Sequence, residues 1–208
     1  YKRQNVERLV AEIKDNEICE IANDNEPNQV VLSGHRTAIE KACVKAKSLG
    51  AKRAILLPVS APFHCSLMAP AQENMINLIS GLNIEKPNVP LISNVTSIPT
   101  QDIEEIRKYL IKQITGRVRW RESILFMKKS GIQIIYEIGP GRVLCNLIKR
   151  IVDDVEQENI SKIEIEKKAN WKNISLKKND LQGKWLMVGR VRNGNEQRRN
   201  LNRPRKTM

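Results

Sequence analysis

Residues 58–70 read PVSAPFHCSLMAP, and they join two segments of different periodicity. The apolar run 54–57 enters this stretch as a strand would, and apolar residues recur at helical three- and four-residue steps from Met68 to Leu82. The prolines fix φ and remove backbone donors, so we expect a stiff turn. Such a turn can present His64, one of two histidines in the chain, to a cleft. A structural histidine that hydrogen-bonds a backbone carbonyl is an equally open interpretation.

The positive charge of the chain is concentrated near its carboxy terminus. The formal net charge is +13, but residues 171–208 hold 11 Lys/Arg and 2 Asp/Glu, which leaves +4 for residues 1–170. This distribution argues against a basic globular surface of the kind that binds nucleic acids. The Arg/Lys-rich residues 198–206 leave a nucleic-acid patch or a localisation signal open. The favoured prediction is that residues 152–208 form a charged, disordered tail.

Cysteine spacing and hydropathy further narrow the class of protein. The four cysteines, at positions 19, 43, 65 and 145, form no C-x-x-C pair. This argues against a metal site and a disulfide framework, and it indicates the reducing environment of the cytoplasm. No apolar run approaches the roughly 18 residues of a membrane span. Because the chain begins with Tyr1, we interpret the start as a truncation and leave organellar targeting open.

The order of predicted elements indicates an α/β protein. Residues 1–58 predict helix, strand, strand, helix and strand, which is a ferredoxin-like subdomain without its opening strand. Residues 59–151 predict an α/β core with a parallel sheet, because the strand at 132–138 is apolar almost throughout. The predicted helices are 5–14, 37–49, 68–82, 102–114, 121–129 and 143–151, and the predicted strands are 18–22, 29–33, 53–59, 90–95 and 132–138.

Several strings follow one another in a recognisable order. They are ANDNEPNQVVLSG (22–34), GAKRA (50–54), PVSAPFHCSLM (58–68), SNV (93–95), QIT (113–115), VRW (118–120) and EIGPGRVL (137–144). Together they resemble the malonyl-CoA:acyl carrier protein transacylase family of fatty acid synthesis, over residues 6–151. The resemblance is to the carboxy-terminal part of the family, so residues 59–151 are expected to be the corresponding part of an acyltransferase core. By the same resemblance, the amino-terminal part of the family, which carries the nucleophile, is expected to be absent from these residues.

The resemblance implies transfer of a malonyl group from coenzyme A to the phosphopantetheine thiol of acyl carrier protein. His64 matches the general base and acid, and Gln113 matches a residue whose backbone carbonyl receives the other ring proton of that histidine. Asn25 matches an asparagine near the site, although an Asx-type turn before Pro27 is an equally open role. Malonyl-CoA and acyl carrier protein are then the expected partners, with no tightly bound cofactor and no metal.

Phe63 precedes the predicted base and carries a separate hypothesis about selectivity. In related acyltransferases a phenylalanine at this place goes with malonyl, and a smaller residue goes with methylmalonyl. A ring beside C2 of the acyl group would exclude the extra methyl, a discrimination worth about 1–3 kcal/mol.

The nucleophile of the family has no match in these residues. No Gly-x-Ser-x-Gly elbow occurs, and residues 34–38, GHRTA, have Arg36 where the serine would stand and are predicted to open a helix. Cys65 is no substitute, because the side chains of adjacent residues on a turn usually diverge, and its thiol would not face the His64 ring. We therefore expect this fragment to be inactive by itself. The alternatives are a fragment of the acyltransferase domain of a polyketide or multifunctional fatty acid synthase, and an inactive truncated product with a basic tail.

Two charged or glycine-rich features leave binding roles open. Arg117, Arg119 and Arg121 could steer an acidic carrier protein by long-range attraction, or they could be a solvated basic turn. Residues 139–141, GPG, could hold an anion before a helix. A tight packing turn is the favoured interpretation of the second feature.

Overall fold

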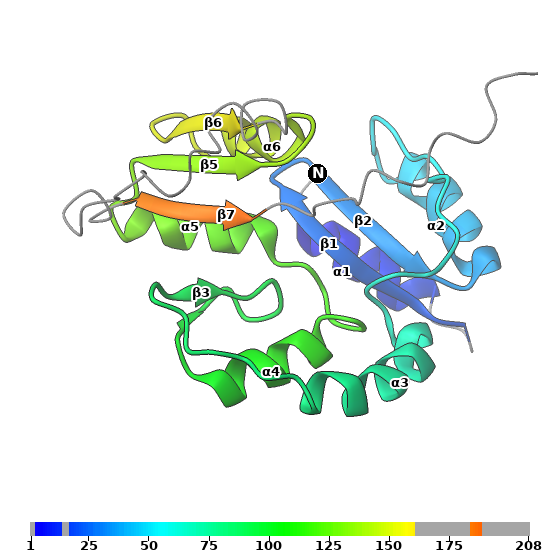
Figure 1. Cartoon of the computed structure of the whole chain (residues 1–208). Coiled ribbons are helices and arrows are strands. Elements are labelled where there is room, and N and C mark those ends of the chain that lie inside the picture. The colour runs from blue at the N-terminus through cyan, green and yellow to red at the C-terminus, as the bar shows by residue number, and fades with distance from the viewer. Residues whose placement is uncertain (1–2, 14–16, 161–183, 189–208) are drawn as a thin grey trace, which may run out of the picture.

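The computed structural model describes residues 3–13, 17–160 and 184–188, the last segment by its backbone (Figure 1). The helices are α1 (Arg3–Ile13), α2 (Arg36–Ser48), the short 3-10 helix η1 (Ser66–Met68), α3 (Ala69–Ser80), α4 (Ile103–Lys112), α5 (Trp120–Lys129) and α6 (Val143–Ile151). The strands are β1 (Cys19–Glu26), β2 (Gln29–Gly34), β3 (Leu91–Ile92), β4 (Pro99–Thr100), β5 (Ile134–Ile138), β6 (Glu156–Ile160) and β7 (Lys184–Val188). Among the described residues, no helix is long and apolar enough to cross a membrane.

The first part of the chain is a hairpin covered by two helices. Strands β1 and β2 pair antiparallel, and α1 and α2 pack on them through a core that includes Leu9, Ile13 and Ala38. These four elements follow the predicted order. The predicted strand at 53–59 is wrong: this segment pairs with no strand among the described residues, and its large apolar side chains are between 47% and 62% exposed. An apolar run becomes a strand only where a neighbour takes up its backbone N–H and C=O groups. The described residues therefore contain the hairpin β1–β2 without the third strand of a ferredoxin-like sheet.

Gly34 ends β2 at a place with no room for a side chain. A Cβ atom there would lie 1.9 Å from the carbonyl oxygen of Ile18, which also accepts the backbone N–H of His35 at 2.8 Å. We expect Gly34→Ala to lower the free energy of unfolding by about 1–3 kcal/mol, because the hairpin must shift. Gly81→Ala is the control, since its nearest contact would be 3.5 Å and its φ is −82°. Equal urea midpoints for the two variants would contradict the prediction.

The second part is organised on a parallel sheet, which confirms that prediction. Strand β5 lies between β6 and β7 and is parallel to both (Figure 1). Helices α5 and α6 pack on it, and the core includes Ile124, Ile135 and Ile148. The predicted strand at 90–95 shortens to β3, which pairs only with β4.

The structure differs from the sequence prediction for part of the expected tail. Residues 152–160 continue the folded core, because Val152 and Val155 are buried in it and β6 adds to the sheet. The backbone of β7 pairs with β5 as well. The two valines lie in an acidic segment without a clear hydrophobic period, so the sequence gives no sign that they belong to the core. The remaining parts of the predicted tail, 161–183 and 189–208, lie outside the described residues.

Helices α3 and α4 lie side by side below the sheets in Figure 1. Two predicted site residues adjoin them: His64 lies shortly before α3, and Gln113 directly follows α4. Asp102 is the N-cap of α4 and accepts the backbone N–H of Glu105 at 2.8 Å. The guanidinium group of Arg107 donates to the carbonyls of Ser80 and Leu82 at 3.1 and 3.2 Å, at the end of α3. This contact joins the middle of α4 to the end of α3, and α4 then runs on to its C-cap, Gln113.

Candidate functional site

His64 and Gln113, which are 49 residues apart in sequence, meet in the structure. The Nδ1 atom of His64 lies 2.9 Å from the backbone oxygen of Gln113. Gln113 is the C-cap of α4, where the last carbonyls of a helix have no intrahelical partner and are free to accept. Because a carbonyl only accepts, Nδ1 must donate its proton. The neutral ring therefore carries its free lone pair on Nε2.

The turn that carries His64 is tight and unusual. His64 has a φ of 62°, in the left-handed region that residues other than glycine seldom adopt. Cys65 is fully buried and its Sγ donates to the carbonyl of Pro62 at 3.2 Å. The next residue, Ser66, donates from its backbone N–H and its hydroxyl to the carboxylate of Glu20 on β1. The sequence analysis missed Glu20, since a lone glutamate in a strand gives no signal of this contact.

Among the described residues, the side chain of Asn25 forms no hydrogen bond with the His64 ring. The side chain of Asn25, on β1, donates to Gln29 Oε1 at 3.5 Å. The turn after β1 is instead stabilised by Glu26, whose carboxylate accepts the backbone N–H of Asn28 at 3.0 Å. Phe63 precedes His64 in the turn and is 47% exposed.

The Nδ1 atom of the second histidine, His35, accepts a hydrogen bond, whereas that of His64 donates one. His35 is the N-cap of α2, and its Nδ1 accepts the backbone N–H of Ile18 at 2.8 Å. The GHRTA string therefore ends a strand and opens a helix, as predicted. At a pH where both rings are neutral, we expect His64 to be protonated on Nδ1 and His35 on Nε2. Two-bond proton–nitrogen correlation spectra of the chain will show both forms; the same tautomer at both histidines would contradict these hydrogen bonds.

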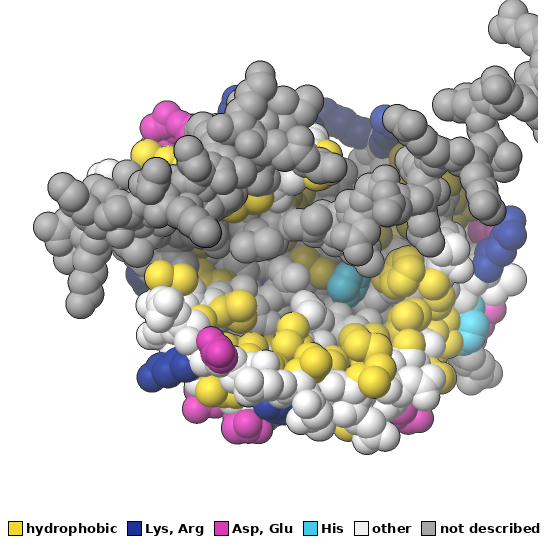
Figure 2. All heavy atoms as spheres, viewed as in Figure 1, with side chains coloured by type: hydrophobic (Ala, Val, Ile, Leu, Met, Phe, Trp, Pro, Cys, Tyr) yellow, Lys and Arg dark blue, Asp and Glu magenta, His cyan; other side chains and the backbone are white. Residues whose placement is uncertain are grey.

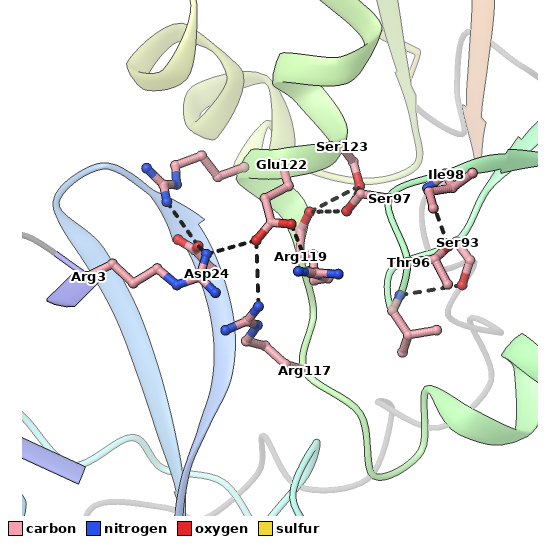
Figure 3. A network of polar contacts seen from close by, with 12 residues as sticks. Arg3, Asp24, Ser93, Thr96, Ser97, Ile98, Arg117, Arg119, Glu122 and Ser123 are labelled. Atoms are coloured by element: carbon pink, nitrogen blue, oxygen red, sulfur yellow. Dashed lines mark hydrogen bonds and ion pairs between the residues drawn. The ribbon is translucent and has the colours of Figure 1, made fainter. Parts of the chain in front are cut away.

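The three arginines of the predicted basic turn point inward at carboxylates. Figure 3 shows the carboxylate of Glu122 between Arg117 and Arg119. Its oxygens lie 3.6 Å from a guanidinium nitrogen of Arg117 and 2.8 Å from one of Arg119. Arg3 also pairs with Glu122, at 2.9 Å. Arg121 pairs with the buried carboxylate of Asp24 at 3.2 Å. Burial lowers the pKa of Arg117, and the nearby charges of Arg3 and Arg119 lower it further.

The backbone of the same segment joins the two parts of the chain. Val118 donates its N–H to Ala22 and accepts the N–H of Asp24, while the N–H of Arg119 bonds to Asn94. This segment therefore lies between β1 and the loop after β3 and fixes their relative positions.

The glycine-rich turn at 139–141 is occupied by the protein itself. The backbone N–H groups of Leu144 and Cys145, at the start of α6, donate to the carboxylate of Glu137 at 3.1 and 3.0 Å. Glu137 is buried, and its charge suits the positive end of the helix dipole. These contacts agree with a packing turn. Burial, together with the hydrogen bond to Glu137, raises the pKa of Cys145 to about 11.

One face of the molecule exposes many large apolar side chains. Figure 2 shows them gathered around a hollow on the face that carries α3 and the segment leading to it. The exposed apolar residues along this stretch of the chain are Ile55, Leu56, Leu57, Val59, Phe63, Met75, Ile76, Leu78 and Leu82. A contiguous surface of this kind usually marks contact with another protein segment. Among the described residues, no cluster of His, Cys, Asp and Glu side chains could hold a metal ion.

Solved structures with this fold are acyltransferases. The crystal structure of an acyl-carrier-protein-S-malonyltransferase from Bartonella henselae is 42% identical with a TM-score of 0.76, and the match covers 84% of this chain and 56% of that one. A malonyl-transacylase in complex with a type II PKS acyl-carrier protein is 37% identical with a TM-score of 0.75, over 77% of this chain and 52% of that one.

Curated relatives named malonyl CoA-acyl carrier protein transacylase match the chain over about seven tenths of its length. The Escherichia coli (strain K12) protein is 38% identical over 148 residues, which are 71% of this chain and 48% of that protein. The Synechocystis protein is 36% identical over 157 residues, which are 76% of this chain and 53% of that protein. No protein-family model matches the chain. The chain is a homologue of the malonyl CoA-acyl carrier protein transacylases, and it spans about half the length of the curated relatives that it matches.

Proposed function

We propose that this chain is part of a malonyl-CoA:acyl carrier protein transacylase and supplies its general base and acid, His64. The observation that supports this most directly is the hydrogen bond from His64 Nδ1 to the Gln113 carbonyl. It fixes the tautomer in which Nε2 can accept a proton, which is the form that a general base requires. It also orients the ring through a neutral acceptor, and a carbonyl dipole can stabilise the imidazolium ion that forms.

The proposed reaction has two half-reactions that share one base. A serine hydroxyl, from the part of the relatives that this chain does not span, gives its proton to His64 Nε2 as its oxygen bonds to the malonyl carbonyl carbon. The C–S bond to coenzyme A then breaks, and the departing sulfur takes the proton. In the second half the phosphopantetheine thiol gives its proton to His64 and attacks the seryl ester. The proton returns to the serine oxygen, and malonyl leaves on the carrier protein.

Phe63 and Asn25 have supporting roles in this proposal. Phe63 is half-exposed beside His64, so its ring is free to line the space beside C2 of the acyl group. It would disfavour methylmalonyl by about 1–3 kcal/mol. Asn25 lies on β1 and would contribute a polar group near the acyl chain, without a direct bond to the histidine.

The partners follow from the same proposal. Malonyl-CoA is the acyl donor, the phosphopantetheine of acyl carrier protein is the acceptor, and the reaction takes place in the cytoplasm. The four free cysteines agree with a reducing compartment. A carrier protein of a polyketide system is the second candidate acceptor, because one structural neighbour is solved in complex with a type II PKS acyl-carrier protein.

The exposed apolar face has a place in this proposal. The large apolar side chains of residues 55–59 are about half-exposed, and the relatives have about twice the length of the matched region. The remaining part of such a protein would cover this face and supply a strand neighbour to residues 55–59. The serine would then approach His64 from the same side.

A fusion protein tests the proposal. The amino-terminal half of the Escherichia coli relative is joined to the full 208-residue chain. Malonyl transfer is then measured from malonyl-CoA to acyl carrier protein that bears phosphopantetheine with a free thiol. We expect the fusion to transfer malonyl and the unfused chain to be inactive. A folded fusion that binds malonyl-CoA but transfers nothing would overturn the proposal. Polyketide and fatty acid carrier proteins offered side by side distinguish the two acceptors.

A further inference from the structure

Ser66 forms the contact that fixes the backbone of the histidine turn from outside. Its N–H donates to Glu20 Oε2 at 3.1 Å, and its hydroxyl donates to Glu20 Oε1 at 2.6 Å. Both oxygens of one carboxylate are thus used on one residue, two positions after His64. Hydrogen bonds to an ionised acceptor are shorter and stronger than neutral ones. Among the described residues, Glu20 is the only acceptor for either group of Ser66.

His64 needs support of this kind because of its backbone conformation. A residue other than glycine with a φ of 62° persists only where its surroundings determine the conformation. Within the turn, the bonds from Phe63 N to Ala61 O and from Cys65 Sγ to Pro62 O are local. From outside the turn, the Gln113 carbonyl holds the ring and Glu20 holds the backbone that follows it. The ring can stay on Gln113 only while the backbone stays where Glu20 keeps it.

Glu20 reaches the turn from a separate part of the fold. It lies on β1, next to the fully buried Cys19, in the strand whose backbone also bonds to Val118. The position of the carboxylate is therefore set by the hairpin and not by the turn itself. We infer that Glu20 is a positioning residue, which holds the His64 ring on the Gln113 carbonyl through Ser66. Any contribution of Glu20 to catalysis rests on the proposed function, but its effect on the orientation of the His64 ring does not.

The first test needs no activity. In proton–nitrogen correlation spectra of the full chain, we expect Glu20→Ala to change His64 from the fixed Nδ1–H form to a mixture of tautomers. His35 reports independently that β1 is in place, because it bonds to Ile18 at the start of the strand. Glu17→Ala is the matched control, since the Glu17 carboxylate bonds to Thr37 and Lys41 and not to the turn. Glu20→Gln keeps one acceptor oxygen, so its His64 signal should lie between those of the unsubstituted chain and of Glu20→Ala.

The results separate this inference from a purely structural role. A Glu20→Ala chain in which both histidines keep their tautomers would overturn it. If Glu20→Ala also disturbs His35, Ser66→Ala decides, because it removes one of the two bonds and leaves β1 intact; an unchanged His64 signal there would overturn the inference as well.

The second test uses the fusion protein described above. We expect Glu20→Ala to lower kcat on the order of 10- to 100-fold while KM for malonyl-CoA stays the same, because the base is misplaced and the substrate site is not. A changed tautomer with an unchanged kcat would overturn the catalytic part. If the unsubstituted fusion is inactive but Glu20→Ala still frees the His64 ring, the proposed function fails and the positioning role stands.

Discussion

Replacing His64 with alanine in the fusion protein is expected to lower kcat for malonyl transfer by about 10²- to 10⁴-fold. The imidazole is the group that would take the proton from the serine and return it to the departing sulfur. Without it both half-reactions depend on water as the base. Binding of malonyl-CoA should change little, because the proton transfers that the imidazole would serve take place after the substrate has bound. Steady-state rates at saturating and limiting malonyl-CoA measure the two effects separately.

His35 provides a matched control for this prediction. His35→Ala removes the other imidazole, whose Nδ1 accepts the Ile18 N–H beside β1, and it should lower stability while leaving kcat close to that of the parent fusion. A His64→Ala fusion that keeps more than about a tenth of the parent kcat would contradict the role of general base. It would then favour the structural histidine that the sequence left open.

The sequence predicted the helices well because each carries its own local signal. The turn signal at residues 58–70 and the apolar stripes of α4 and α6 lie within a few residues of the observed elements. The meeting of His64 and Gln113 came from the family resemblance and not from any periodicity. Nothing in the local sequence relates two positions that are 49 residues apart.

The features that the sequence missed are all long-range. The strand expected at 53–59 has no partner in the described structure, and periodicity cannot report whether a partner exists. The core positions of Val152 and Val155 lie within an acidic segment that is similar in composition to a solvated one. The contact of Glu20 with Ser66 joins a strand to a turn 46 residues away. Propensity and pattern describe neighbours in sequence, so such contacts need the fold.

The largest effect on stability is expected at Asp24, whose carboxylate is the least exposed ionisable group of the network in Figure 3. It is 1% exposed and lies 3.4 Å from Arg3 and 3.2 Å from Arg121, while its backbone N–H bonds to Val118. Removing one partner of a buried ion pair costs about 3–5 kcal/mol, because the remaining charge is left uncompensated. The two guanidinium groups are 29% and 26% exposed, so water takes up part of that cost. We expect Asp24→Ala to lower the free energy of unfolding by about 3 kcal/mol.

Two further variants make this prediction specific to the buried carboxylate. Asp24→Asn keeps the shape and one acceptor oxygen but removes the charge. Its free energy of unfolding should therefore lie between those of the parent chain and of Asp24→Ala. Glu40→Ala removes a carboxylate from an exposed pair with Arg36, at 2.9 Å, and should cost no more than about 1 kcal/mol. Urea unfolding of the full chain, followed by circular dichroism, measures all three. Equal midpoints for Asp24→Ala and Glu40→Ala would show that the network is no more than a surface feature. A large difference would place Asp24 among the groups that hold α1, β1 and the segment before α5 together, and so hold β1 where Glu20 can reach Ser66.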